Sequence, residues 1–150
     1  MSLNFELPLL FLRQGRLIEG MKKSLQLWLK AAALYNILYG AFCVLAPQLI
    51  FEWMNIQTPL YLEFWQCIGM IVGVYGLGYW WASKNYIRHW PIVAVGFLGK
   101  IFGPIGFVYS VYTGKFPLAF GFVILCNDLI WWPSFSMMLK EAWKEHGFKE

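Results

Sequence analysis

The stretch AAALYNILYGAFCVLAPQLIF, residues 31–51, contains no Asp, Glu, Lys or Arg. A helix needs about 20 mainly apolar residues to cross the hydrocarbon core of a bilayer, so this stretch is long enough for one crossing. Trp28 and Lys30 come just before it, and both residue types anchor helix ends at the membrane boundary. We therefore predict a first membrane span over about residues 28–51.

Three more stretches of the same kind follow. Residues 64–83, FWQCIGMIVGVYGLGYWWAS, are also free of charged residues. Residues 90–113 contain a single charge, Lys100, and residues 116–139 contain a single charge, Asp128. The connections between the four stretches are too short for another folded unit. The sequence thus predicts an all-α integral membrane protein, a bundle of four transmembrane helices that forms one domain over the whole chain.

The composition points to the same class. Charged residues make up 13% of the chain, whereas soluble domains contain roughly 25%. The nine Trp and eight Tyr residues are types that collect at membrane–water boundaries. With 59% apolar residues, the chain is too hydrophobic for a disordered protein or a secreted disulfide scaffold. Because it has no run of basic residues, we expect the lipid bilayer as its partner and no nucleic acid.

The distribution of Lys and Arg predicts the orientation in the membrane. Basic residues are retained on the cytoplasmic side, and outside the four spans only Lys115 lies on the opposite side from all the others. We therefore expect both termini in the cytoplasm and the protein in the cytoplasmic (inner) membrane of a bacterium. The basic residues expected on the cytoplasmic side are Arg13, Arg16, Lys22, Lys23, Lys30, Lys84, Arg88, Lys140, Lys144 and Lys149.

The two ends of the chain are expected to lie outside the spans. The first 25 residues mix apolar and basic side chains, and Leu9–Leu12 is too short an apolar run to cross a membrane. We interpret this part as a separate interfacial segment. From Met137 onward, charged residues recur at helical spacing, so the tail is predicted to extend the fourth helix into the cytoplasm.

Glycines predict where helices approach closely, because lipid provides no hydrophobic drive for their association. Two glycine faces stand out, and we predict that they form the tightest contact in the bundle. These are Gly69, Gly73 and Gly76 in the second span, and Gly96, Gly99, Gly103 and Gly106 in the third. Pro104 lacks an N–H, so it should free the carbonyl of Lys100 and bend the third helix.

The two intramembrane charges are predicted to lie at one depth. Lys100 lies ten residues after Trp90, about 15 Å along a helix. Asp128 lies eleven residues before Leu139, about 16 Å from the same boundary, because the fourth helix runs the opposite way. Asn36 reaches nearly this level from the first span, at about 12 Å. Exposure of either charge to lipid costs roughly 2.5–3.5 kcal/mol, so we expect the two to face each other.

Two interpretations of this polar cluster remain open. It is either a structural device that fixes helix partners and register, or a site that binds a ligand headgroup or carries a proton. Tyrosines at helical spacing in the first two spans are placed to line a pocket beside it: Tyr35, Tyr39, Tyr75 and Tyr79. The candidate ligand or proton site therefore consists of Lys100, Asp128, Asn36, Tyr39 and Tyr75.

Several chemistries are not supported by the sequence. The three cysteines form no CxxC pair, which a disulfide-exchange enzyme needs. Both histidines, His89 and His146, lie at span ends, which argues against a haem held between two histidines inside the bundle. There is no His and carboxylate cluster for a metal and no Ser or Cys with a neighbouring base. We expect no metal, no cofactor, no catalytic residue and a non-enzymatic role.

A glycine-bearing first helix that closes on a proline, YNILYGAFCVLAP over residues 35–47, precedes the glycine-rich GMIVGVYGLGYWWAS, residues 69–83, and two further spans. This layout, over roughly residues 28–139, resembles the DoxX-like group of small four-helix bacterial membrane proteins. The resemblance implies a four-helix fold and, from some members, a link to quinone-dependent sulfur or redox systems. It carries over no catalytic residue. Small multidrug exporters match less well, because their hallmark glutamate in the first helix corresponds to Asn36 here.

Two main classes of function follow, and a membrane-embedded enzyme ranks third behind them. The leading hypothesis is a small non-enzymatic inner-membrane protein, either an accessory subunit that associates with other membrane subunits or with itself, or a binder of a hydrophobic small molecule such as a lipid or quinone. Short connections and abundant glycine and aromatic surfaces favour it. The alternative is a proton-coupled small-molecule transporter that uses the pair Lys100 and Asp128.

Overall fold

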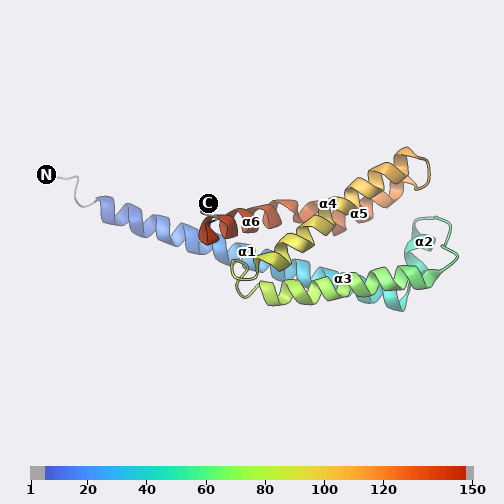
Figure 1. Cartoon of the computed structure of the whole chain (residues 1–150), viewed down its shortest axis with the longest axis horizontal. Coiled ribbons are helices and arrows are strands. Elements are labelled where there is room, and N and C mark those ends of the chain that lie inside the picture. Colours follow the sequence, from blue (N-terminus) through green and yellow to red (C-terminus); the bar gives the residue numbers. More distant parts are fainter. Residues whose placement is uncertain (1–5, 148–150) are drawn as a thin grey trace.

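The computed structural model describes residues 6–147, with side chains from Gln14 onward, and every regular element in that part of the chain is helical. Helices α1 and α3 lie side by side in one half of the molecule, while α4 runs with α5 and α6 in the other (Figure 1). The N-terminal part of α1 extends beyond the other helices. The elements are α1 (Glu6–Leu45), α2 (Leu49–Trp53), α3 (Leu62–Ala82), α4 (Trp90–Tyr112), the 3-10 turn η1 (Leu118–Phe120), α5 (Gly121–Asn127), the 3-10 turn η2 (Leu129–Trp131) and α6 (Trp132–His146).

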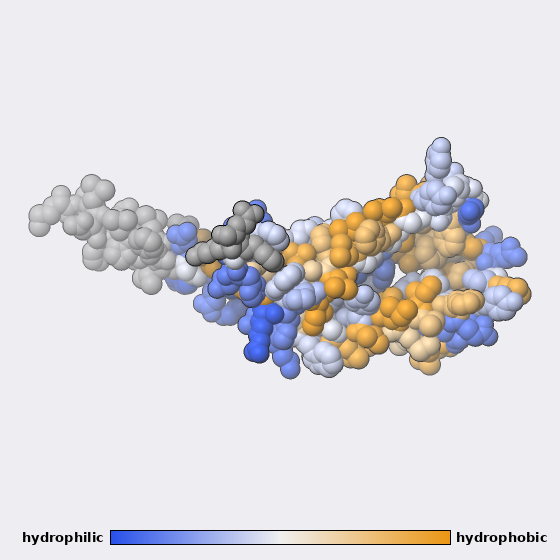
Figure 2. Space-filling model, in the orientation of Figure 1, coloured by the Kyte–Doolittle hydropathy of each residue, from blue (hydrophilic) through white to orange (hydrophobic). Residues whose placement is uncertain are grey.

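Within the described residues, three segments are long and apolar enough to cross a membrane: Gln14–Leu45, Trp90–Tyr112 and Leu118–His146. Figure 2 shows orange apolar surface in a belt between blue polar ends, as expected for a protein whose middle lies in lipid. The predicted class, a helical multi-pass membrane protein, agrees with this arrangement.

Helix α3 is not among these three segments, although it has 21 residues. Its Gly, Trp and Tyr residues contribute little to hydropathy, even though Trp and Tyr are at home near membrane boundaries. The membrane crossing predicted over residues 64–83, the second of the four predicted spans, therefore stays a prediction.

The N-terminal part of the chain differs from the expectation. Instead of a separate interfacial segment followed by a span, residues 6–45 form one continuous helix of 40 residues. The first span was also expected to reach residue 51, but α1 ends at Leu45 and α2 follows Pro47 as a separate short helix. Proline cannot bond the preceding turn and disfavours the α conformation of the residue before it, which ends α1 here.

The expected single helix over residues 116–139 is wrong in the same way. It is interrupted at Asp128, whose φ of −122° and ψ of −62° are not helical, so that α5, η2 and α6 replace it. Pro133, in the first turn of α6, has no N–H for the carbonyl four residues earlier, and this favours a break just before it. The predicted extension of the last helix past Met137 is confirmed, since α6 runs to His146.

The tightest helix contact is between α1 and α3, not between α3 and α4 as the glycine faces suggested. A Cβ atom on Gly40 would lie 2.5 Å from the Gly69 carbonyl oxygen and 2.8 Å from the Gly73 nitrogen. Gly76 likewise packs against the α1 backbone at Ala33. The α3 glycines thus serve α1, because Gly40 and Ala33 on α1 are small enough to let the backbones approach.

Two apolar clusters close the two ends of the bundle. One gathers Leu29, Tyr79 and Phe135 from α1, α3 and α6, and the other joins Phe51 of α2 to Phe120 of η1. The buried polar residues Asn36, Lys100 and Asp128 lie between these two clusters along α1, α4 and the segment broken at Asp128. Apolar packing therefore encloses them on both sides.

The connection between α3 and α4 is held at the end of the bundle where the basic residues predict the cytoplasm. Gln26 of α1 donates a hydrogen bond to the Lys84 carbonyl, and His146 of α6 contacts the Ile87 carbonyl oxygen at 2.8 Å. The Tyr86 hydroxyl donates to the Glu141 carboxylate. Burial, and then this bond, raise the pKa of Tyr86 above its ordinary range. The short connection therefore fastens α1, α4 and α6 together.

We expect Gly40→Ala to lower the stability of the protein, because its methyl group meets the α3 backbone, which cannot move aside as a side chain could. Overpacking of this kind costs about 1–3 kcal/mol. Gly73→Ala is the matched control, since a Cβ there meets nothing within 4 Å. Thermal unfolding in mild detergent should show a lower Tm for the first variant alone, and equal Tm values would contradict the close α1–α3 contact.

Candidate functional site

The predicted meeting of the two intramembrane charges is confirmed. Lys100 of α4 and Asp128 at the break are 4% and 5% exposed, and the Lys100 Nζ lies 4.0 Å from the Asp128 Oδ1. This distance makes an ion pair but no direct hydrogen bond. The ammonium instead donates to the backbone carbonyl of Asn127 at 2.5 Å. Lys100 therefore pairs with the carboxylate and with the end of α5 at once.

The helix break explains why backbone carbonyls can accept bonds from side chains here. At the end of α5 the regular pattern of bonds between successive turns stops, which leaves carbonyls without helical partners. The Asn127 carbonyl accepts from Lys100, and the Cys126 carbonyl accepts from the Trp131 indole at 3.0 Å. Irregular backbone at membrane depth is tolerated where the protein satisfies it or where it lines a cavity.

Pro104 produces a matching carbonyl on α4. The predicted loss of a helical partner for the Lys100 carbonyl is confirmed by its new partner, the Trp132 indole, which donates to it at 3.0 Å. Helix α4 remains one helix from Trp90 to Tyr112 around this proline, and the expected bend stays a prediction. Lys100 thus holds the broken segment at two points, through its ammonium and through its carbonyl.

Two α4 glycines let neighbouring groups come close to this site. A Cβ on Gly103 would lie 2.9 Å from the Asp128 Oδ2, and a Cβ on Gly96 would collide with the Tyr79 ring. Gly99 and Gly106 are not packing glycines, because a Cβ at either position would meet nothing within 4 Å. The glycines of α4 therefore leave room for the Asp128 carboxylate and the Tyr79 ring, and they do not form a continuous backbone contact with α3.

A cavity of about 140 Å³ lies at the centre of this arrangement. Its polar lining comes from α1, α3, α4 and the segment broken at Asp128, and its apolar lining comes mainly from α3. The lining residues are Asn36, Ile71, Val72, Tyr75, Tyr79, Gly96, Gly99, Lys100, Asn127 and Asp128. A space of this size in a polar setting has room for several waters or for one small polar group.

Aromatic rings border the Lys100 ammonium. Its Nζ lies 6.0 Å from the centre of the Tyr79 ring and 5.9 Å from that of the Trp131 ring. Both distances are at the limit at which a ring face attracts a cation. The cation therefore has one strong hydrogen bond, one ion pair and two weak ring contacts, which leaves its donor capacity incompletely used.

Asn36 is the least satisfied polar group of the cavity. Its side chain is 3% exposed, yet its amide oxygen has no hydrogen-bond partner. Asn127 shows the same pattern, since its amide nitrogen donates to Asp128 at 3.0 Å while its amide oxygen has no partner. Buried polar atoms are nearly always paired, so two unpaired acceptors in one cavity call for a donor.

The structure brings four of the five sequence-predicted site residues together. Lys100, Asp128, Asn36 and Tyr75 line the cavity, whereas Tyr39 does not. Tyr39 stacks on Tyr35 with ring centres 5.8 Å apart and packs towards the apolar cluster around Phe51. About one turn of helix separates Tyr39 from Asn36, and the Tyr39 side chain packs against Tyr35 and that apolar cluster instead of lining the cavity.

Sequence reasoning missed Asn127, Trp131 and Trp132. In an unbroken helix, Asn127 would point about 100° away from Asp128 and out of the site. The break at Asp128 removes that geometry and places both side chains on the cavity. The sequence signal for it was Pro133, which follows the two tryptophans.

The fold and the site define a class: a helical membrane protein with a charged polar cavity at the level of a broken helix. Comparison with protein-family models, with curated proteins and with solved structures finds no match to this chain. The DoxX-like resemblance accordingly stays a prediction. Among the described residues, no three His, Cys, Asp or Glu side chains are grouped so that they could hold a metal ion.

We expect Lys100→Met and Asp128→Leu each to lower the stability of the folded protein by about 3–5 kcal/mol, because each leaves a buried charge without its partner. The double variant should recover much of this loss, since replacing both charges with apolar side chains can be nearly neutral. Recovery should stay incomplete by about 1–3 kcal/mol, because the Asn127 carbonyl loses its donor.

Thermal or denaturant unfolding of the four proteins in detergent forms a double-mutant cycle that measures this coupling. Losses that simply add in the double variant would show that the two charges act independently.

Proposed function

We propose that this protein binds a small amphipathic molecule inside the membrane, and that the molecule's polar group occupies the cavity between Asn36, Lys100 and Asp128. The observation that carries the proposal is the unpaired amide oxygen of Asn36 in a cavity that also holds an ion pair. A ligand that donates a hydrogen bond there would complete the site.

A purely structural role explains these contacts less well. Buried polar networks that only hold helices together are stable when every member is satisfied. Here the Lys100 Nζ and the Asp128 Oδ1 stay 4.0 Å apart, and the amide oxygens of Asn36 and Asn127 have no partner. The cluster therefore favours binding over helix pairing alone.

The lining of the cavity favours a ligand that comes from the lipid. Ile71 and Val72 of α3 and Gly99 of α4 border it, and Ile71 and Gly99 are exposed. Helices α3 and α4 make far less contact with each other than α1 and α3 do. A molecule with a polar head and an apolar body fits an entrance between two helices that face the bilayer. Because the site needs a donor, we expect a reduced quinone (a quinol) or a lipid whose headgroup carries a hydroxyl or an amine.

The placement in the cell belongs to the same proposal. We place the protein in a bacterial inner membrane with four spans, α3 included, and with both termini in the cytoplasm. The excess of Lys and Arg on one side supports the orientation. The pairing of α3 with α1 along their length supports a membrane crossing by α3, because α1 itself is long and apolar enough to span.

A specific observation also favours the alternative, a proton-coupled transporter. Discontinuous helices whose broken ends face a binding site are a recurring feature of transporters, and the break at Asp128 is of this kind. A carboxylate held near a lysine is a group that can exchange a proton. The accessory subunit, the other form of the leading hypothesis, draws its support from the exposed apolar surface of the protein.

We expect an amphipathic small molecule to co-purify with the protein in mild detergent and to be lost from Asn36→Val. That substitution removes an amide oxygen that has no partner, so it should leave the fold intact and weaken only the ligand. One hydrogen bond at about 1–1.5 kcal/mol corresponds to roughly five- to tenfold less retained ligand. Solvent extraction followed by mass spectrometry measures it.

Tyrosine variants supply the matched control. Tyr75→Phe changes the cavity lining, whereas Tyr39→Phe changes a tyrosine outside it and should retain the ligand like the wild type. If no small molecule is enriched with any of these proteins, the binding proposal fails. Stoichiometric partner proteins in the same preparation would then favour the accessory subunit, and proton flux in reconstituted vesicles would favour the transporter.

The proposed orientation in the membrane predicts which cysteines can be labelled from outside the cell. In a variant without Cys43, Cys67 and Cys126, a cysteine at Thr58 should react with a membrane-impermeant maleimide added to intact cells. A cysteine at Glu145 should react only after the cells are opened, because the tail is expected in the cytoplasm. Both positions are exposed, so access across the membrane alone decides the result. The reverse labelling pattern would overturn the orientation.

A further inference from the structure

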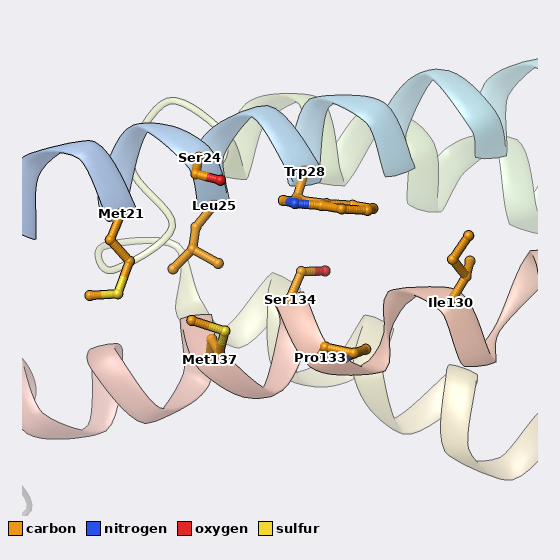
Figure 3. Close-up of a pocket in the computed structure, with 8 residues that line it drawn as sticks. All are labelled: Met21, Ser24, Leu25, Trp28, Ile130, Pro133, Ser134 and Met137. Atoms are coloured by element: carbon orange, nitrogen blue, oxygen red, sulfur yellow. The ribbon is translucent and has the colours of Figure 1, made fainter. Parts of the chain in front are cut away.

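A second cavity, separate from the polar one, lies between α1 and the start of α6. It measures about 270 Å³, and Figure 3 shows side chains from both helices pointing into the space between them. It shares no lining residue with the polar cavity. The lining consists of Met21, Ser24, Leu25 and Trp28 from α1, and of Ile130, Pro133, Ser134 and Met137 from η2 and α6. We call it the α1–α6 groove.

The groove is apolar and open to the surroundings of the protein. Met21, Trp28, Ile130 and Met137 are between 39% and 50% exposed, so they contact whatever lies outside. The hydroxyl of Ser134 is already used, because it donates to the Trp131 carbonyl at 3.0 Å. At the membrane boundary predicted near Trp28, the surrounding medium supplies acyl chains, and these match an open apolar groove.

Positive charge continues the groove on α6. Pro133, Met137, Lys140 and Lys144 are spaced by four, three and four residues, so they lie along one stripe of the helix. At 1.5 Å per residue, the two lysines follow Met137 by about 5 and 10 Å. Both are exposed, and within the described residues neither has an ion-pair partner.

The acidic side chains nearby do not cancel these charges along the stripe. The Glu141 carboxylate accepts the Tyr86 hydroxyl on the side of the α3–α4 connection. Glu145 is about 100° around the helix from Lys144. The end of the groove that is expected to reach the headgroup region therefore presents two lysines with unused charge.

We infer that the α1–α6 groove binds an anionic phospholipid, with an acyl chain between Met21 and Met137 and its phosphate at Lys140 and Lys144. The apolar groove accounts for the chain, and the two lysines in line with it select a negative headgroup over a zwitterionic one. This site neither requires nor excludes the ligand proposed for the polar cavity.

Native mass spectrometry of delipidated protein tests the inference. The probes are palmitoyl-oleoyl phosphatidylglycerol and phosphatidylcholine with the same chains. Phosphatidylglycerol should bind more tightly than phosphatidylcholine. The double variant Lys140→Gln/Lys144→Gln should weaken phosphatidylglycerol binding about 25-fold, since each lysine near an anionic headgroup contributes about fivefold. Lys30→Gln/Lys84→Gln removes two other exposed cations from the same predicted side and should weaken it much less.

The acyl-chain part has its own test. Met21→Gln/Met137→Gln makes the groove polar at two exposed positions and should weaken both lipids, whereas Leu27→Gln, 68% exposed on α1 but off the groove, should not. Glycerol phosphate, which has no chains, should fail to displace phosphatidylglycerol. Equal effects of the two lysine pairs, equal binding of both lipids, or full displacement by glycerol phosphate would each overturn the inference.

Discussion

A backbone carbonyl that loses its helical partner inside a membrane must find another donor within the protein, because lipid offers none. Two prolines impose this constraint here. Pro104 leaves the Lys100 carbonyl to the Trp132 indole, and the break ahead of Pro133 leaves the Asn127 carbonyl to the Lys100 ammonium. These two hydrogen bonds have opposite directions: α4 donates to the broken segment in one, and the broken segment donates to α4 in the other. They hold these two parts together at the depth where the charges lie.

The cavity is a consequence of these hydrogen bonds to backbone carbonyls. Because the Lys100 ammonium is drawn to a carbonyl, it is held at 4.0 Å from Asp128 and does not close on the carboxylate. The glycines on α4 leave space on the same side, and Asn36 completes the wall from α1. A site that satisfies backbone atoms first and side chains second leaves polar capacity for a ligand.

The packing of the helices decides how such a site is reached. The backbones of α1 and α3 meet at Gly40 and Gly69, which makes these two helices a closely packed pair. Helix α4 contacts α3 where the Tyr79 ring lies over Gly96 and where Ile92 packs against Gly78. Apolar clusters on both sides of the cavity join elements from the two halves of the molecule, whereas α3 and α4 make little contact with each other.

The sequence by itself determined the class of protein and the common level of its polar residues along the helices. Hydropathy and the 1.5 Å rise of a helix are local properties, so they place Lys100, Asp128 and Asn36 at one level without knowledge of the fold. Pro104 in the same way determined which carbonyl would need a partner.

Only the tertiary structure decided which helix faces pack and where the fourth segment breaks. The α3 glycines are equally suited to α1 or α4, and the choice depends on the small residues Gly40 and Ala33, which are more than 25 positions away from them in sequence. The break at Asp128 turns Asn127 into the site, while Tyr39 is left outside it. Both outcomes depend on contacts between distant segments, which no local pattern records.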